Sequence, residues 1–232
     1  MTTDELRPTI IDAALALAAE RSYLSVGLAD IAKKADVPLE ALRARYDGRI
    51  AILDDFARSI DERMLAGHDA ASASESPRDR LFEVMMRRFD ALAAYRPGLR
   101  GLRRVALRNP MFAALMNRIA VGSGRWVLAS AGIEPSGTFA PVRSLARAQV
   151  LALITASVIP TFLDDDENGL PKTMAALDKA LARLDRFAKS VSRFEDACDQ
   201  LVSCRPKKRR TPEPDSPPPA APEPTADMAT AV

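Results

Sequence analysis

The chain has 232 residues, of which 47% are hydrophobic and 28% are charged, a balance typical of folded globular proteins. A formal net charge of +2 excludes a bulk polycation, so any binding of nucleic acid has to come from local basic clusters. Aromatic residues make up only 5%, whereas Ala, Leu and Arg are abundant, which favours packed helices over sheets. We therefore expect an all-α protein.

Short helices are predicted in the N-terminal part. The first runs from about Pro8, which suits a first helical turn, to residue 20, with apolar residues repeating at i, i+3, i+4 and i+7. The second spans about 28–35 and the third about 39–46, and a fourth begins near Arg49. These lengths and spacings predict a compact three-helix unit that leads into a longer helix.

Longer helices are predicted in the rest of the chain. Ser76-Pro77 is a cap and first-turn proline that opens a helix, which Arg96-Pro97-Gly98 ends. Asn109-Pro110 opens the next one, and a long apolar helix covers 143–163. A last helix begins near Pro171 and carries an apolar stripe to Phe194. From residue 205 the chain is rich in proline, contains the basic run 207–210, and is predicted to be disordered.

The second break in the N-terminal part, Ala35-Asp36-Val37-Pro38, has the position and length of the turn in a DNA-reading helix-turn-helix. In that motif the second helix places its N-terminal half in the major groove, where side chains reach base edges and phosphates. If Leu42 and Tyr46 turn inward at i, i+4, the more exposed side chains are Leu39, Glu40, Arg43, Ala44 and Arg45. The two arginines suit contacts to phosphate or guanine.

A family resemblance is carried by three groups of residues: Ile10-Ile11-Asp12-Ala13-Ala14-Leu15, the run from Ala29 to Val37, and Leu42, Tyr46 and Leu53. Together they resemble the N-terminal domain of the TetR family of transcriptional regulators, over about residues 8–60. The resemblance implies a helix-turn-helix DNA-binding domain at 1–60, with its reading motif at 27–46. It also implies a larger helical effector-binding and dimerisation domain at 61–204, before the tail of residues 205–232.

The resemblance implies three partners: an operator in double-stranded DNA, a hydrophobic small-molecule effector, and a second copy of the chain. In this family the effector shifts the spacing of the two reading heads and releases the DNA. The chain would then be a ligand-responsive repressor that binds a palindromic operator as a homodimer. The residues expected to contact the DNA are Leu39, Glu40, Ala41, Arg43, Ala44, Arg45, Tyr46 and Arg49.

The alternative is a lipid- or isoprenoid-binding accessory protein that no longer reads DNA. The family usually has Gly-Val-Ser in the turn where this chain has Asp36-Val37-Pro38, and Glu40 is an acid on the reading helix. Residues 1–60 carry 8 Lys/Arg against 10 Asp/Glu, which is unfavourable for phosphate affinity. In addition, 162–166 and 172–178 are similar both to the closing segment of TetR-type proteins and to the lipid-binding COQ9 family of ubiquinone biosynthesis.

Apolar stripes in the larger domain suggest a pocket and an interface. Stripes at 82–92 and 111–119 are either plain core or the lining of an effector pocket, and the candidate pocket residues are Phe89, Leu92, Phe112, Met116 and Trp126. The stripe from 174 to 194 is either intramolecular core or the seam of a four-helix dimer interface, and we favour the seam. Its candidate residues, with those of the preceding helix, are Leu151, Ile154, Met174, Leu177, Leu181 and Leu184.

Basic clusters are the remaining signal for a binding surface. Seven arginines and no acidic residue lie between residues 91 and 133: Arg96, Arg100, Arg103, Arg104, Arg108, Arg118 and Arg125. They form either a basic surface for an anionic ligand, a lipid headgroup or DNA, or a solvated face balanced by acids of neighbouring helices. We favour the balanced face. The run 207–210 either adds non-specific DNA affinity or solubilises the tail.

Catalysis, metal binding and membrane insertion have little support. Cys198, Cys204 and His68 match no metal pattern, and no catalytic constellation is present, so we expect neither enzyme activity nor a cofactor. The acidic turn 164–167 could hold a cation, but a capped helix-to-helix turn also accounts for it. The N-terminus lacks a secretory leader, and the longest uncharged run, 148–163, is too short and too polar for a membrane span. We expect a cytoplasmic protein.

Overall fold

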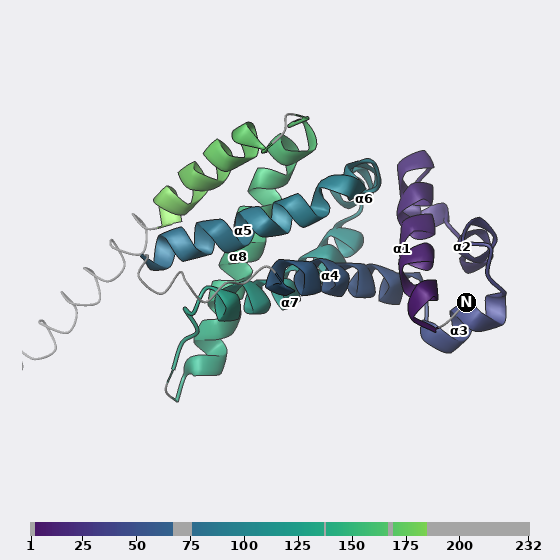
Figure 1. The fold of residues 1–232 in the computed structure, drawn as a ribbon, viewed down its shortest axis with the longest axis horizontal. Helices are drawn as coiled ribbons and strands as arrows, with labels where there is room; N and C mark the ends of the chain where they lie inside the picture. The colour runs from purple at the N-terminus through teal and green to yellow at the C-terminus, as the bar shows by residue number, and fades with distance from the viewer. Residues whose placement is uncertain (1–2, 67–75, 137, 167–168, 185–232) are drawn as a thin grey trace, which may run out of the picture. The chain divides into compact units, whose positions relative to one another are not determined.

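The computed structural model describes residues 3–66, 76–136, 138–166 and 169–184, and every regular element within these ranges is a helix (Figure 1). The prediction of an all-α protein is confirmed. Several sequence-based expectations fall outside the described residues. These concern His68, the end of the last apolar stripe at 185–194, the two cysteines, the basic run and the proline-rich tail.

The N-terminal helices are α1 (Thr3–Glu20), the 3-10 turn η1 (Tyr23–Ser25), α2 (Leu28–Lys34), α3 (Leu39–Arg45) and α4 (Arg49–Ala66). Figure 1 shows α1, α2 and α3 gathered at one end of α4, and we call them the head. The predicted start of the first helix was wrong, because α1 already begins at Thr3 and Pro8 lies inside it. So near the helix start, the proline removes a single backbone hydrogen bond.

The remaining labelled helices are α5 (Pro77–Leu92), the 3-10 turn η3 (Ala93–Tyr95), α6 (Arg96–Arg108), α7 (Pro110–Ser130) and α8 (Ala140–Leu163). We call α5 to α8 the body. The expectation that Arg96-Pro97-Gly98 ends a helix was incomplete, because α5 ends at Leu92 and these three residues open α6. Proline restricts the backbone before it but is well suited to a first helical turn, so the same residue can follow one helix and begin another.

Two helix starts predicted from cap residues are confirmed. The hydroxyl of Ser76 accepts a hydrogen bond from the backbone N–H of Asp79 at 3.2 Å, and Pro77 occupies the first turn of α5. The side-chain oxygen of Asn109 accepts from the N–H of Phe112 at 2.9 Å, with Pro110 in the first turn of α7. Each cap satisfies a backbone donor that the helix itself leaves unpaired.

Two glycines allow helix backbones to approach closely. The most extensive helix pair is α7 with α8, followed by α1 with α6. A Cβ on Gly124 of α7 would lie 2.9 Å from the carbonyl oxygen of Ala148 on α8. At Gly101 of α6 the approach is tighter, since a Cβ there would lie 1.7 Å from the carbonyl oxygen of Ala18 on α1. The head and the body are therefore joined by backbone-to-backbone packing of α1 on α6.

Helix α8 is apolar on more than its buried face. Among the described residues it is the one helix long and apolar enough to cross a membrane, with a mean hydropathy of 1.5 over an 18-residue window. That criterion concerns length and composition only. Leu151, Ile154 and Val158 of α8 are packed in the core, yet only 33% of the window is buried. An apolar surface therefore remains on this helix.

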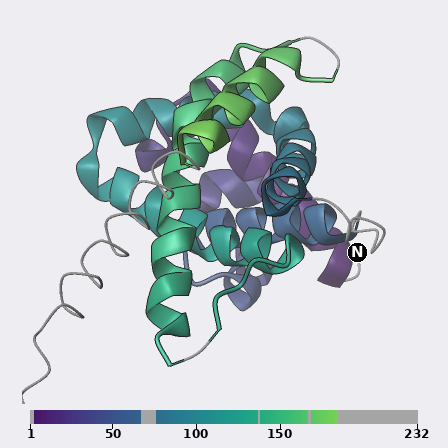
Figure 2. The ribbon, with the colours of Figure 1, turned by 90° about the vertical axis from the view of Figure 1, so that its left-hand side faces the viewer.

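The segment after α8 forms a capped turn into a helix over residues 171–184, drawn in green along α5 in Figure 1 and beside α8 in Figure 2. One carboxylate oxygen of the buried Asp165 accepts from the N–H of Thr173 at 2.7 Å and from its hydroxyl at 2.8 Å. Burial acts to raise the pKa of Asp165, but these hydrogen bonds outweigh it, and the pKa is lowered. The capped-turn interpretation of the acidic segment agrees with this geometry.

Candidate nucleic-acid interface

The turn between α2 and α3 ends α2 through two backbone hydrogen bonds. The N–H of Val37 donates to the carbonyl of Ala32 at 3.0 Å, and the N–H of Asp36 donates to that of Lys33 at 3.3 Å. This pattern is the Schellman motif, which needs a left-handed residue after the last helical one. Asp36 takes that conformation with φ of 54°, and aspartate tolerates it better than most side chains. The unusual turn sequence therefore still forms the tight turn of a helix-turn-helix.

Two side chains fix α3 in the head. Leu42 is fully buried and Tyr46, directly after the helix, is 5% exposed, so the inward pair expected from their spacing is present. The hydroxyl of Tyr46 donates to a carboxylate oxygen of Asp55 at 2.7 Å. Burial and, after it, the hydrogen bond to Asp55 raise the pKa of Tyr46 to about 12. Tyr46 was assigned to the DNA contacts, but its buried and hydrogen-bonded side chain attaches the end of α3 to α4.

The opposite face of α3 is open to solvent. Leu39 is 51% exposed, Glu40, Arg43 and Ala44 are exposed, and Ala41 is partly buried. Arg43 forms an i, i+4 ion pair with Asp47 at 2.8 Å, with both side chains largely exposed. No described part of the chain covers this face, and it carries an apolar residue, an acceptor and a cation within its first two turns.

The other two arginines assigned to the interface are more constrained. Arg45 is partly buried, and its guanidinium carbon lies 5.9 Å from the centre of the Tyr46 ring. Arg49 donates to the carbonyls of Leu24 at 2.8 Å and Val26 at 3.0 Å, so it holds the segment that leads into α2. In this arrangement Arg49 positions the motif from within, whereas Arg43 lies on its surface.

Asp55 of α4 links several N-terminal segments, and the sequence analysis did not identify it. Besides accepting from Tyr46, its carboxylate receives the guanidinium of Arg7 on α1, at 2.9 Å to one oxygen and 3.2 Å to the other. Arg7 also binds Glu62 at 2.6 Å, and this hydrogen bond is the largest cause of the raised pKa of Arg7. These residues come from three separate helices, so no local spacing could have indicated them.

Several acids of the N-terminal helices α1, α2 and α4 form ion pairs with neighbouring cations. Besides Asp55, Glu20 pairs with Lys34 at 2.9 Å and Asp30 pairs with Arg21 at 2.6 Å. The backbone N–H of Gly27, followed by the charge of Arg21, lowers the pKa of Asp30. Four of the ten acids of residues 1–60 are thus paired with described cations, namely Glu20, Asp30, Asp47 and Asp55. Glu40 is the acid on the outer face of α3 itself.

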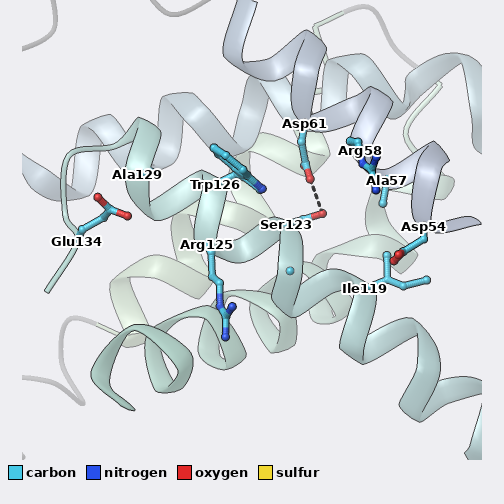
Figure 3. Close-up of a pocket in the computed structure, with 11 residues that line it drawn as sticks. Asp54, Ala57, Arg58, Asp61, Ile119, Ser123, Arg125, Trp126, Ala129 and Glu134 are labelled. Atoms are coloured by element: carbon cyan, nitrogen blue, oxygen red, sulfur yellow. Dashed lines mark hydrogen bonds between the residues drawn. The ribbon is translucent and has the colours of Figure 1, made fainter. Parts of the chain in front are cut away.

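A cavity of about 450 Å³ lies between α4 and α7 (Figure 3). Its floor holds Asp61, which accepts from the hydroxyl of Ser123 at 2.8 Å and from the guanidinium of Arg88 on α5. Burial lowers the pKa of Arg88 to about 10, so it stays charged at neutral pH. Trp126, 56% exposed, lines the cavity. It is the one residue of the predicted effector pocket that does so.

The other predicted pocket residues belong mainly to the core. Phe89, Leu92 and Phe112 are at most 6% exposed, Met116 is partly buried, and none of the four lines this cavity. A second cavity of about 450 Å³, with a mainly apolar lining, lies instead between α5, α7, α8 and the helix of 171–184. Its lining includes Leu81, Leu128, Val150, Leu151 and Leu184, with Arg78 and Arg147 among them. Apolar periodicity marked these helices as inward-facing but could not separate filled core from cavity wall.

The predicted dimer residues are mostly used within one chain. Leu151, Ile154, Leu177 and Leu181 are buried, Leu184 is partly buried, and Met174 is 44% exposed. The buried four therefore pack in the core of one subunit, which was the other interpretation of their stripe. The exposed apolar residues of α8 lie on its opposite side: Val142 at 68%, Leu145 at 48% and Leu153 at 59%.

Comparison with known proteins places the fold among TetR regulators. No protein-family model and no curated protein sequence matches the chain. Among solved structures, a TetR transcriptional regulator from Nitrosomonas europaea superimposes with a TM-score of 0.57 at 22% identity, over 76% of this chain and 96% of that one. A TetR regulator from Rhodococcus sp. RHA1 gives 0.51 at 20% identity, over 79% and 97%. The chain therefore has the TetR-type fold, with an N-terminal helix-turn-helix unit and a larger helical region.

Proposed function

We propose that the protein is a TetR-type transcriptional regulator, a cytoplasmic homodimer that binds a palindromic operator in double-stranded DNA. The observation that supports this most directly is the outer face of α3. It is exposed, it follows a tight turn in a helix-turn-helix, and its helix is locked from behind by Leu42 and Tyr46. A rigid helix with an uncovered polar face is what major-groove reading requires.

Four side chains of α3 each suit a particular contact with DNA. Arg43 and Arg45 would bind guanine or phosphate, Glu40 would accept from a cytosine amino group, and Leu39 would contact a thymine methyl. The Arg43–Asp47 pair is solvent-exposed, and such pairs contribute only about 0.2–1 kcal/mol, so DNA can replace Asp47 as the partner of Arg43. Arg49 and Tyr46 would act by positioning the motif.

The dimer interface is proposed on the exposed side of α8, with Met174 from the following helix. Val142, Leu145 and Leu153 are large apolar side chains that a single chain leaves in water, on a helix whose apolar window is only 33% buried. A second copy packed on this side would bury them and form a symmetric four-helix contact. Leu153→Glu should yield a monomer in sedimentation, whereas Leu39→Glu, equally exposed on α3, should remain dimeric.

The effector is proposed to be a hydrophobic small molecule bound in the cavity between α5, α7 and α8. The volume of about 450 Å³ and the apolar lining are typical of drug-sized ligand sites. Repression is proposed to end when the ligand shifts the two heads. Val150→Trp should fill the cavity and make operator binding insensitive to an effector found by screening against the operator complex, and retained sensitivity in this variant would place the ligand elsewhere.

Selection of DNA from genomic fragments by the purified protein, with competitor DNA at near-physiological salt, tests the regulator proposal. We expect enrichment of a palindromic site. No enrichment even at low salt, together with co-purified lipid, would instead support the lipid-binding alternative.

Variants connect the selected site to α3. Arg45→Ala should weaken operator binding by about 1–3 kcal/mol if Arg45 reads a base. Arg63→Ala is the matched control, because Arg63 is an exposed arginine of α4 bound to Tyr95 of the body, at 3.1 Å from its hydroxyl. Equal affinities of the two variants would remove Arg45 from the interface.

A further inference from the structure

The arginines between residues 91 and 133 are not balanced in the way the sequence suggested. Within the described part of the chain, one of the seven has an acidic partner, the pair of Arg100 with Asp166 at 3.8 Å. The guanidinium of Arg96 lies over the Phe162 ring, 5.0 Å from its centre. Arg103, Arg104, Arg108, Arg118 and Arg125 make no ion pair with any described residue. The predicted balance is therefore not provided by direct ion pairs with described acids, and these five arginines are exposed to solvent.

Two of these arginines lie in a cleft between the head and α6. The cleft has a volume of about 310 Å³. On the head side it is lined by Arg21 and Ser22, which follow α1, and by Leu24 of η1. On the other side it is lined by Gly101, Arg104, Val105 and Arg108 of α6 and by Asn109 directly after it. No acidic residue is among them. Three cations, a hydroxyl and a carboxamide therefore face one small space.

The charge of this cleft comes mainly from α6. Arg21 is partly neutralised by Asp30, at 2.6 Å, whereas Arg104 and Arg108 have no counter-ion among the residues that the structure describes. They are separated by one helical turn, an arrangement in which like charges repel each other. The side-chain oxygen of Asn109 caps α7, which leaves its NH2 group as a donor. An anion in the cleft would relieve the repulsion and accept from both guanidinium groups.

We propose that this cleft binds a small phosphate-bearing molecule, such as a phosphate monoester or a diphosphate. Arginine presents its donors in a planar fork that matches two phosphate oxygens, and several phosphate oxygens can be bound at once. The volume lies at the lower limit of ligand pockets, which suits a small metabolite and not a duplex. The hydroxyl of Ser22 supplies a further donor from the head side.

The position of the cleft would allow a bound ligand to influence the orientation of the head. It spans the end of α1 and the part of α6 where Gly101 contacts the backbone of Ala18. A phosphate held by both sides would fix the orientation of the head on the body. On the basis of the proposed DNA-binding function, the ligand would then change the operator affinity, and operator DNA would change the phosphate affinity by the same factor.

Calorimetric titration with inorganic pyrophosphate at low salt tests the site without any operator. We expect saturable binding with one ligand per chain, at least tenfold weaker in Arg104→Gln/Arg108→Gln. Arg103→Gln is the matched control, because Arg103 is an exposed arginine of the same helix that makes no ion pair with a described residue and does not line the cleft. This variant should bind within twofold of the parent. Far-ultraviolet circular dichroism checks that each variant is folded.

Three results would overturn the proposal. The first is no saturable binding of pyrophosphate to the folded parent protein. The second is an equal loss of binding in Arg103→Gln and the double variant, which would indicate a diffuse basic surface. The third is absence of pyrophosphate binding combined with weaker operator binding in the double variant, which would make these arginines DNA contacts. Failure of the DNA-binding proposal alone would leave pyrophosphate binding intact, so the two are separable.

Discussion

Two aspartates of α4 show how differently the head and the body use charge. Asp55, toward the head, accepts from Arg7 and Tyr46, and Arg7 continues to the exposed Glu62. Asp61, toward the body, binds Arg88 and Ser123 beside the cavity between α4 and α7. The pKa of Arg7 is raised, chiefly through its bond to Glu62, whereas burial lowers that of Arg88 to about 10. The pKa of Arg7 is therefore governed mainly by its acidic partners, whereas the pKa of Arg88 is governed mainly by loss of hydration.

Because of this difference, we expect that removing one partner of Asp55 and removing one partner of the Asp61–Arg88 pair will change the stability by unequal amounts, although both aspartates lie on α4. In the head, water can replace a missing partner, since Arg7 and Glu62 are partly exposed. In the body, the side chains of Arg88 and Asp61 are only 12% and 9% exposed, so a charge left alone there would be poorly hydrated, which is unfavourable. The following changes test this difference, from the largest expected effect to the smallest.

Asp61→Ala should lower the free energy of unfolding by about 3–5 kcal/mol, because Arg88 would remain largely buried, with 12% of its side chain exposed, without its counter-charge. Urea denaturation followed by circular dichroism measures this. Replacing both partners in Asp61→Leu/Arg88→Met should recover most of the loss, since no unpaired charge remains. A double variant as unstable as the single one would show that packing, and not charge, is responsible.

Gly101→Ala should destabilise the protein by about 1–3 kcal/mol, because the added methyl group forces α6 away from the backbone of α1. Thermal unfolding measures the loss. Gly122→Ala is the control, because a Cβ at Gly122 of α7 meets nothing within 4 Å, and it should be neutral or slightly stabilising. An unchanged stability for Gly101→Ala would mean that the two helices can separate without cost.

Tyr46→Phe should cost about 1.5 kcal/mol, the lower end for hydrogen bonds to charged groups, because solvent reaches the remaining Asp55–Arg7 pair. Chemical denaturation gives this value. The comparison between the two aspartates would fail if Tyr46→Phe cost as much as Asp61→Ala. Operator affinity should fall as well, since the end of α3 loses its attachment to α4.

Asp36→Gly should stabilise the protein by about 0.5 kcal/mol, because glycine adopts the left-handed conformation of this turn without steric strain. Asp36→Ala should instead destabilise it by about 1 kcal/mol, since alanine lacks the short polar side chain that eases this conformation. Differential scanning calorimetry resolves both signs. A loss of stability in Asp36→Gly would show that the aspartate side chain contributes contacts that outweigh the strain.

The sequence by itself determined the elements whose signals are local. The capped starts at Ser76 and Asn109, the inward pair Leu42 and Tyr46, and the turn at Asp36 depend on neighbours within a few residues. Spacing and cap chemistry are therefore sufficient to predict them. The exposed face of α3 followed from the same periodicity, which is why the candidate DNA-reading residues could be named before the fold was known.

Only the tertiary structure decided which apolar stripes form core, cavity wall or exposed surface. It also decided which charged side chains form ion pairs. In the sequence, the spacing of Leu177 and Leu181 fits a dimer interface as well as it fits a core. The spacing of Phe89 likewise fits a pocket wall as well as a core, and all three side chains are buried. The contacts of Asp55, the Asp61–Arg88 pair and the cleft between Arg21 and Arg104 join helices that are distant in sequence. Periodicity reports which side of a helix is apolar, but the partner of that side is set by how the helices pack in three dimensions.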